Sequence, residues 1–143
     1  AVDFNLLIPF LPAAPAGWTA DEPTGGRFTA QDGSWSMVSR QYSNIADERK
    51  DASITIVDSA YLAVGGWEAW KTFTTVETTD GYYRSDQVAG FPAWETYSKP
   101  SSYGKWIGIN ERFMVYVSID DGTKADLDLF VNAINYRGIA TLG

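Results

Sequence analysis

The feature that most constrains the fold is a set of four β-prone runs in the second half of the chain, joined by very short connections. The runs cover 82–88, 91–99, 103–109 and 112–119. The connections between them are Ala89-Gly90, Pro100-Ser101-Ser102 and Asn110-Glu111. A parallel crossover needs about a dozen residues or more, so connections this short join antiparallel neighbours. The sequence therefore predicts a meandering antiparallel sheet.

The first half of the chain predicts three more strands. They are expected at 28–30, 34–42 and 52–58, with the first two joined as a hairpin by a turn at 31–33. Side chains alternate between the two faces of a strand, so Trp35 and Met37 are expected on the face opposite Val38. In the β-branched run at 52–58, Ile54 and Ile56 share one side.

A clear helical signal lies near the end of the chain. Thr123, followed three residues later by Asp126, resembles a capping box with Asp in place of the usual Glu or Gln. Four apolar residues then recur at helical spacing, Leu127, Phe130, Val131 and Ile134. Together with the strands they predict an α+β fold, a meandering antiparallel sheet with the C-terminal helix packed on one face.

The remaining segments are expected to form short helices and coil. Asp3 is expected to cap a short apolar helix over 4–8. An extended coil rich in Pro and Gly follows over 12–26, with Trp18 as its anchor in the core. The segment 60–73 is expected to be a loop with a short helix.

The amino-acid composition excludes several classes of chemistry. The chain has 143 residues with no Cys and no His, so it lacks the usual ligands of zinc, iron–sulfur clusters and haem. It also lacks the residues of Ser-His and Cys-His relays. Its 18 acidic and 11 basic residues give a net charge of −7, which repels phosphate backbones. We expect one domain, residues 1–143, with no cofactor and no nucleic-acid partner.

The first residues bear on location. The chain begins Ala1-Val2-Asp3, as a mature N-terminus does after removal of a signal peptide, although a trimmed chain would begin in the same way. No apolar run approaches the roughly 20 residues that a membrane span needs. We expect a secreted or cell-envelope protein without a membrane span.

Several turn and core motifs resemble those of a known family. They are Leu6-Leu7-Ile8-Pro9-Phe10-Leu11-Pro12, Ala14-Pro15-Ala16-Gly17-Trp18, Glu22-Pro23-Thr24-Gly25, Gly90-Phe91-Pro92-Ala93-Trp94-Glu95, Arg112-Phe113-Met114-Val115 and Asn132-Ala133-Ile134-Asn135. Across most of its length the chain resembles secreted or lipid-anchored archaeal and bacterial proteins, similar in layout to PsbP, Mog1 and LpqN-like domains. The resemblance implies an α+β fold, an extracytoplasmic location and a role in binding or assembly. Ala1 departs from the Cys of a lipid-anchored member.

Aromatic side chains are the main candidates for a binding surface. Six Trp, eight Tyr and seven Phe are more than a small core readily accommodates. Adjacent strand residues point to opposite faces, so at most one of Tyr82 and Tyr83 can enter the core. We predict a surface for a protein partner or a second copy, built from Tyr82, Tyr83, Trp94 and Trp106. A carbohydrate surface and plain cross-strand packing are the alternatives.

Carboxylates near the last helix suggest calcium only superficially. Asp120, Asp121, Asp126 and Asp128 are close in sequence but lack the Asp-x-Asp-x-Asp-Gly alternation of a calcium loop. Turn and capping roles account for these side chains, so we expect no metal site.

An envelope hydrolase is a further alternative, because paired carboxyl groups on one cleft can perform acid–base catalysis. The candidates are Glu77, Asp80 and Glu95. Glu95 follows Trp94, and a flanking indole is expected to raise the pKa of a carboxyl group.

Overall fold

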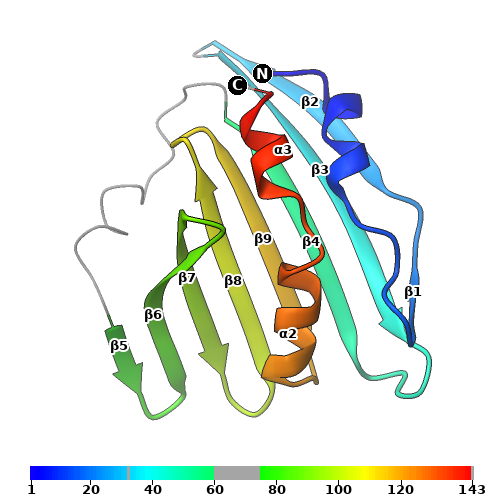
Figure 1. The fold of residues 1–143 in the computed structure, drawn as a ribbon, viewed down its shortest axis with the longest axis vertical. Helices are drawn as coiled ribbons and strands as arrows, with labels where there is room; N and C mark the ends of the chain where they lie inside the picture. Colours follow the sequence, from blue (N-terminus) through cyan, green and yellow to red (C-terminus); the bar gives the residue numbers. More distant parts are fainter. Residues whose placement is uncertain (32, 60–74, 143) are drawn as a thin grey trace.

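One antiparallel sheet spans the molecule, and short helices lie across it (Figure 1). The structure, a computed structural model, describes residues 1–31, 33–59 and 75–142. The strands are β1 (Trp18–Ala20), β2 (Thr24–Ala30), β3 (Gly33–Asn44), β4 (Asp51–Asp58), β5 (Thr75–Thr78), β6 (Gly81–Val88), β7 (Phe91–Ser98), β8 (Ser102–Ile109) and β9 (Phe113–Asp120). Within the described residues their order is β1-β3-β4-β9-β8-β7-β6-β5, with β2 also paired to β3. The predicted antiparallel sheet is confirmed.

The sequence prediction was wrong about the strands at the two edges of the sheet. The coil expected over 12–26 contains β1 and the start of β2, both paired with the long β3. Gly25 does not break β2, because the absence of a side chain lets Phe4 and Val38 approach; an added Cβ would lie 2.8 Å from Val38. β5 was not predicted, since it is short, polar and exposed. The loop and helix expected over 60–73 lie outside the described residues, as does Asp32.

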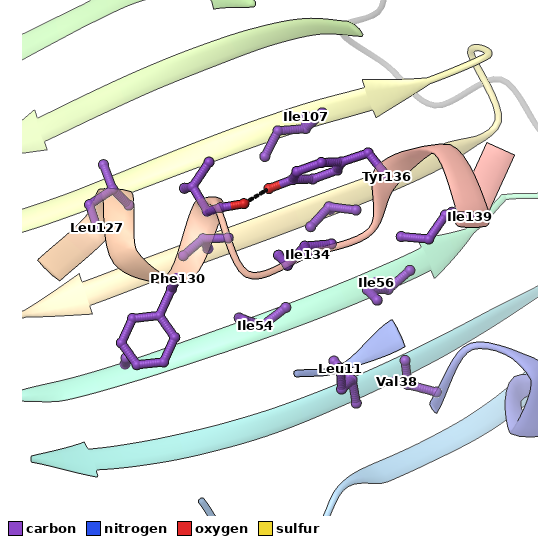
Figure 2. Close-up of a cluster of buried hydrophobic side chains, with 14 of the residues drawn as sticks. Leu11, Val38, Ile54, Ile56, Ile107, Leu127, Phe130, Ile134, Tyr136 and Ile139 are labelled. Carbon is purple, nitrogen blue, oxygen red and sulfur yellow. Dashed lines mark hydrogen bonds between the residues drawn. The ribbon is translucent and has the colours of Figure 1, made fainter. Parts of the chain in front are cut away.

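The two faces of the sheet have different roles. We call the face that carries Val38, Ile54 and Ile56 the helix face, because these fully buried side chains lie beneath the helices (Figure 2). We call the opposite face, which carries Met37 and Tyr116, the open face. The predicted alternation in β3 and β4 is confirmed.

The C-terminal helix is shorter than predicted. α2 (Lys124–Val131) begins with the predicted capping box, in which Thr123 and Asp126 each accept the other's backbone N–H. It ends at the C-cap Asn132, so Ile134 lies beyond it, and Asn135 caps a second helix, α3 (Tyr136–Ala140). The Tyr136 hydroxyl donates to the Val131 carbonyl at 2.6 Å and ties the two helices together (Figure 2).

The core between the helices and the sheet is continuous. α2 and α3 contribute Leu127, Phe130, Val131, Tyr136 and Ile139, and the connecting residues contribute Ile134. Phe130 packs edge-on against Trp18 with 4.9 Å between ring centroids, so the predicted anchoring role of Trp18 is confirmed.

The N-terminal segment packs against the helix face at β2 and β3. Asp3 caps η1 (Phe4–Leu6) as predicted, but this segment forms two 3-10 turns, η1 and η2 (Ile8–Phe10), in place of one helix over 4–8. Leu7 and Leu11 are buried in the common core.

A buried ion pair joins the end of β4 to the residue that precedes β9. Asp58 is fully buried on β4 and accepts from the Arg112 guanidinium at 2.8 and 3.0 Å. The backbone N–H of Val2 also donates to Asp58 at 2.7 Å, which holds the N-terminal segment against β4.

Candidate functional site

A row of large aromatic side chains crosses the middle of the open face. Trp94 on β7 lies opposite Trp106 on β8, which lies opposite Tyr116 on β9. The rings of Trp106 and Tyr116 are 4.0 Å apart between centroids and inclined by 31°. All three side chains are half-buried, so each presents part of its ring to the surface.

Other exposed apolar side chains lie on the same face, off this row and toward both ends of the sheet. Tyr83 on β6 is 46% exposed, and Met37 on β3 is 37% exposed. Phe28, 41% exposed on β2, stacks on Trp35 with 5.5 Å between ring centroids. Strand alternation places all of them on the open face. The open face therefore carries a central aromatic row and further exposed apolar side chains toward both ends of the sheet.

Three of the four predicted binding residues share this face. Tyr83, Trp94 and Trp106 lie on the open face, whereas Tyr82 lies on the helix face, as the alternation of adjacent residues requires. Sequence reasoning missed Tyr116 as the cross-strand neighbour of Trp106, and it did not relate Met37 on β3 to the same face. The alternation of side chains within each strand could be inferred from the sequence. The positions of these residues relative to one another also depend on the pairing of β8 with β9 and of β3 with β4, which the sequence did not reveal.

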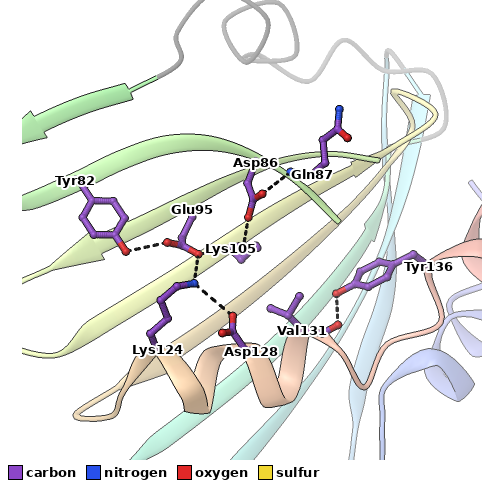
Figure 3. A network of polar contacts seen from close by, with 9 residues as sticks. All are labelled: Tyr82, Asp86, Gln87, Glu95, Lys105, Lys124, Asp128, Val131 and Tyr136. Carbon is purple, nitrogen blue, oxygen red and sulfur yellow. Dashed lines mark hydrogen bonds and ion pairs between the residues drawn. The ribbon is translucent and has the colours of Figure 1, made fainter. Parts of the chain in front are cut away.

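A polar network lies on the helix face beneath the start of α2 (Figure 3). Glu95 on β7 is 2% exposed and receives the Lys124 ammonium at 2.9 Å and the Lys105 ammonium at 3.0 Å. Its other oxygen accepts from the Tyr82 hydroxyl at 2.8 Å. Lys105 is also buried and contacts Asp86 at 2.6 Å. The buried Glu95 and Lys105 are thus neutralised by each other and by two groups that are about half exposed, Lys124 and Asp86.

These contacts set the pKa of Glu95 in the direction opposite to the sequence prediction. Burial alone would raise its pKa, but hydrogen bonds from Lys124, Tyr82 and Lys105 outweigh burial and lower the pKa to about 2. Trp94 lies on the opposite face and gives no such raise. Burial and the adjacent Glu95 raise the pKa of Tyr82 to about 12. Glu95 is held ionised, which does not suit a general acid.

A second, smaller feature lies beside this network, at the start of β6 and the end of β7. Tyr82, Tyr97 and Tyr103 form a tilted ladder with 5.5 and 4.8 Å between successive ring centroids. Next to it is a shallow hollow of about 240 Å³, lined by Glu77, Thr78, Gly81, Tyr82, Tyr97 and Lys99. Aromatic rings beside an acid and a base offer contacts of the kind that a sugar ring uses.

The acidic residues near α2 have protein partners. Asp126 caps the helix and pairs with Lys50 at 3.1 Å. Asp120 and Asp121 accept from Ser102 and Ser101, and Asp128 pairs with Lys124. In the described residues no group of three or more acidic side chains is arranged to hold a metal ion.

We predict that chelation of metal ions leaves stability unchanged. Since capping and ion pairing occupy Asp126, the fold has no need of a cation there. The check is the melting temperature with and without EDTA. A drop of more than about 10 °C, well beyond the roughly 2 to 5 °C expected per kcal/mol at this size, would contradict the prediction.

Comparison with known proteins gives no match: no family model, no curated protein and no solved structure matches this chain. Among the described residues, no helix is both long enough and apolar enough to cross a membrane.

Proposed function

We propose that this is a non-catalytic domain of a secreted or cell-envelope protein, and that it acts by binding a protein partner or a second copy through the open face. The observation that carries the proposal is the aligned row of Trp94, Trp106 and Tyr116 on that face. The secreted or envelope setting rests on the motif resemblance.

The open face exposes large apolar side chains to water. Four of the seven exposed large apolar side chains described in the chain lie on the open face, Phe28, Met37, Val76 and Tyr83. Contiguous apolar surface is costly to leave in water and marks association sites. Tyr and Trp suit such sites, because they bury a large area with few rotatable bonds. A net charge of −7 limits unspecific aggregation.

We predict that association strengthens as salt rises. Salt screens the repulsion between acidic copies, while apolar burial persists. Met37→Glu should weaken association, because it places a charge in the contact. Leu129→Glu is the matched control, since Leu129 is 42% exposed, compared with 37% for Met37, but lies on α2. Light scattering across a salt series measures both variants.

Two outcomes would count against this proposal. Monomers at every concentration and ionic strength would reject self-assembly and leave a foreign partner. An equal effect of Met37→Glu and Leu129→Glu would show that the open face has no special role.

An envelope carbohydrate-binding module is the second candidate, and the hollow at Tyr82 and Tyr97 favours it. Under this alternative, soluble oligosaccharides should change tyrosine fluorescence near the hollow, and Tyr97→Ala should abolish binding while Met37→Glu leaves it intact. The carboxylate-dependent hydrolase has less support, because Glu95 is occupied by two ammonium groups and its pKa is lowered to about 2.

A further inference from the structure

We propose that the two end strands of the sheet pair with each other between copies, β2 of one copy with β5 of the next, so that the copies form one continuous antiparallel sheet. This contact forms through the backbone edges of β2 and β5, whereas the association proposed above forms across the open face, to which the side chains of Phe28 and Val76 also belong. The directions of the two strands, the phase of their backbone groups and the register of their side chains all allow this pairing.

Both strands present an unpaired edge in the described part of the chain. β2 pairs with β3 on one side, and β5 pairs with β6 on one side; within the described residues neither has a strand on its other side. They lie at opposite ends of the sheet (Figure 1). An unpaired edge offers a row of backbone donors and acceptors to another strand.

The strand directions allow head-to-tail growth. From β2 through β3, β4, β9, β8, β7 and β6 to β5, every neighbouring pair is antiparallel. Strand direction reverses at each of these pairs, and the number of pairs is odd, so β2 and β5 run in opposite directions. A second copy in the same orientation therefore brings its β5 antiparallel to β2, with its helices on the same side. Such a heterologous contact leaves an unpaired edge at each end of the pair, so further copies can add in a ring or a filament.

The backbone N–H and C=O groups that point outward from the two edge strands alternate in a way that allows the strands to pair. Two residues separate the partners Ala30 and Gly33, and two separate Thr78 and Gly81. The closing pair of a two-residue hairpin is a hydrogen-bonded pair, and such pairs alternate along the ladder. The backbone groups of Phe28 and Val76 therefore point inward to the hairpin partner, and those of Arg27 and Glu77 point outward.

One register matches these outward groups and the side chains together. It places Arg27 opposite Glu77, Phe28 opposite Val76, and Thr29 opposite Thr75. Arg27 and Glu77 both lie on the helix face, because their partners in the sheet are Ser36 and Tyr82. Within the described residues neither forms an ion pair of its own. A shift by two residues keeps the backbone phase but separates the charges.

The apolar pair in this register completes the match. Phe28 is 41% exposed and Val76 is 39% exposed, and both lie on the open face. Directly opposed residues in a pair without hydrogen bonds have the closer side chains. The contact would therefore remove two exposed apolar side chains from water while pairing the cation of β2 with the carboxylate of β5.

The first experiment is a charge exchange followed by analytical ultracentrifugation. Arg27→Glu and Glu77→Arg each place like charges opposite in every contact, so each variant alone should associate roughly fivefold more weakly than the native chain. An equimolar mixture of the two variants matches charges at every contact in an alternating order. The mixture and the double variant should both recover native association.

The second experiment uses the absence of Cys from the chain. Phe28→Cys combined with Val76→Cys should give a ladder of disulfide-linked multimers under mild oxidation. Phe28→Cys combined with Ile45→Cys is the control, since Ile45 is 67% exposed outside both edges. Adding Met37→Glu to the first pair should leave the ladder in place, which separates this contact from open-face association.

Either of two results would overturn the proposal. One is a mixture of the charge variants that associates no better than each variant alone. The other is a multimer ladder of equal yield in the Ile45→Cys control. Circular dichroism of each variant establishes that it is folded before association is compared.

Discussion

Removal of every residue from Asp120 onward is expected to abolish cooperative unfolding. The truncation deletes six buried apolar side chains, Leu127, Phe130, Val131, Ile134, Tyr136 and Ile139. Each contributes about 1.5 to 3 kcal/mol of burial, against a total stability of about 5 to 15 kcal/mol for an ordinary domain. Their loss also exposes the helix face of β4, β8 and β9. Thermal unfolding followed by circular dichroism measures the effect.

A point substitution tests the same architecture in a chain that still folds. Phe130→Ala should lower the free energy of unfolding by about 3 to 5 kcal/mol, because the ring is fully buried against Trp18 and Tyr42. Leu129→Ala, one residue away and 42% exposed, should change it by about 0.5 kcal/mol or less. A truncated chain that melts cooperatively, or equal effects of the two substitutions, would show that α2 does not close the core.

Glu95→Gln is expected to destabilise the protein by about 3 to 5 kcal/mol at pH 7. The substitution leaves the buried ammonium of Lys105 with Asp86 alone, and breaking a buried ion pair on one side costs this much. Asp128→Asn is the matched control, because it removes the other partner of Lys124 at a site about half exposed. Exposed pairs contribute at most about 1 kcal/mol. Urea unfolding measures both variants.

The same variant predicts a dependence on pH. The pKa of Glu95 is lowered from 4.5 to about 2, so its ionised form stabilises the folded state above pH 4.5. That contribution is lost as the pH falls from about 4.5 towards 2. The charged and titratable groups around it are Tyr82, Arg84 and Asp86 on β6, Lys105 on β8, and Lys124 and Asp128 on α2.

The comparison with the variant isolates Glu95 from other carboxylates. The pKa of Asp86 and that of Asp126 are also lowered, so the native chain loses stability from several groups in acid. The difference in unfolding free energy between the native chain and Glu95→Gln should therefore shrink between pH 4.5 and 2. A constant difference across that range would mean that Glu95 is not held ionised by its partners.

Local features of this protein were accessible to sequence reasoning. The turns at Ala89-Gly90 and Asn110-Glu111 connect strands that are neighbours in the sheet, and both contain residues with positive φ. The capping box at Thr123 joins residues three positions apart. In each case the interacting groups are adjacent in the chain, so residue type and spacing are sufficient. The same alternation placed Tyr82 and Tyr83 on opposite faces.

The tertiary structure alone decided which distant segments meet. The pairing of β4 with β9 joins residues more than 50 positions apart, and only that pairing places Thr55 beside Tyr116, at the end of the row that contains Trp106. Glu95 acquired a low pKa from Lys124, 29 positions away, whereas its neighbour in sequence, Trp94, faces the other side of the sheet. The chain determined its strands, turns and caps through short-range geometry. The composition of each face, the end of α2 and the ionisation of Glu95 depend on contacts that exist only once the sheet has assembled, because burial and charge pairing are properties of the packed structure.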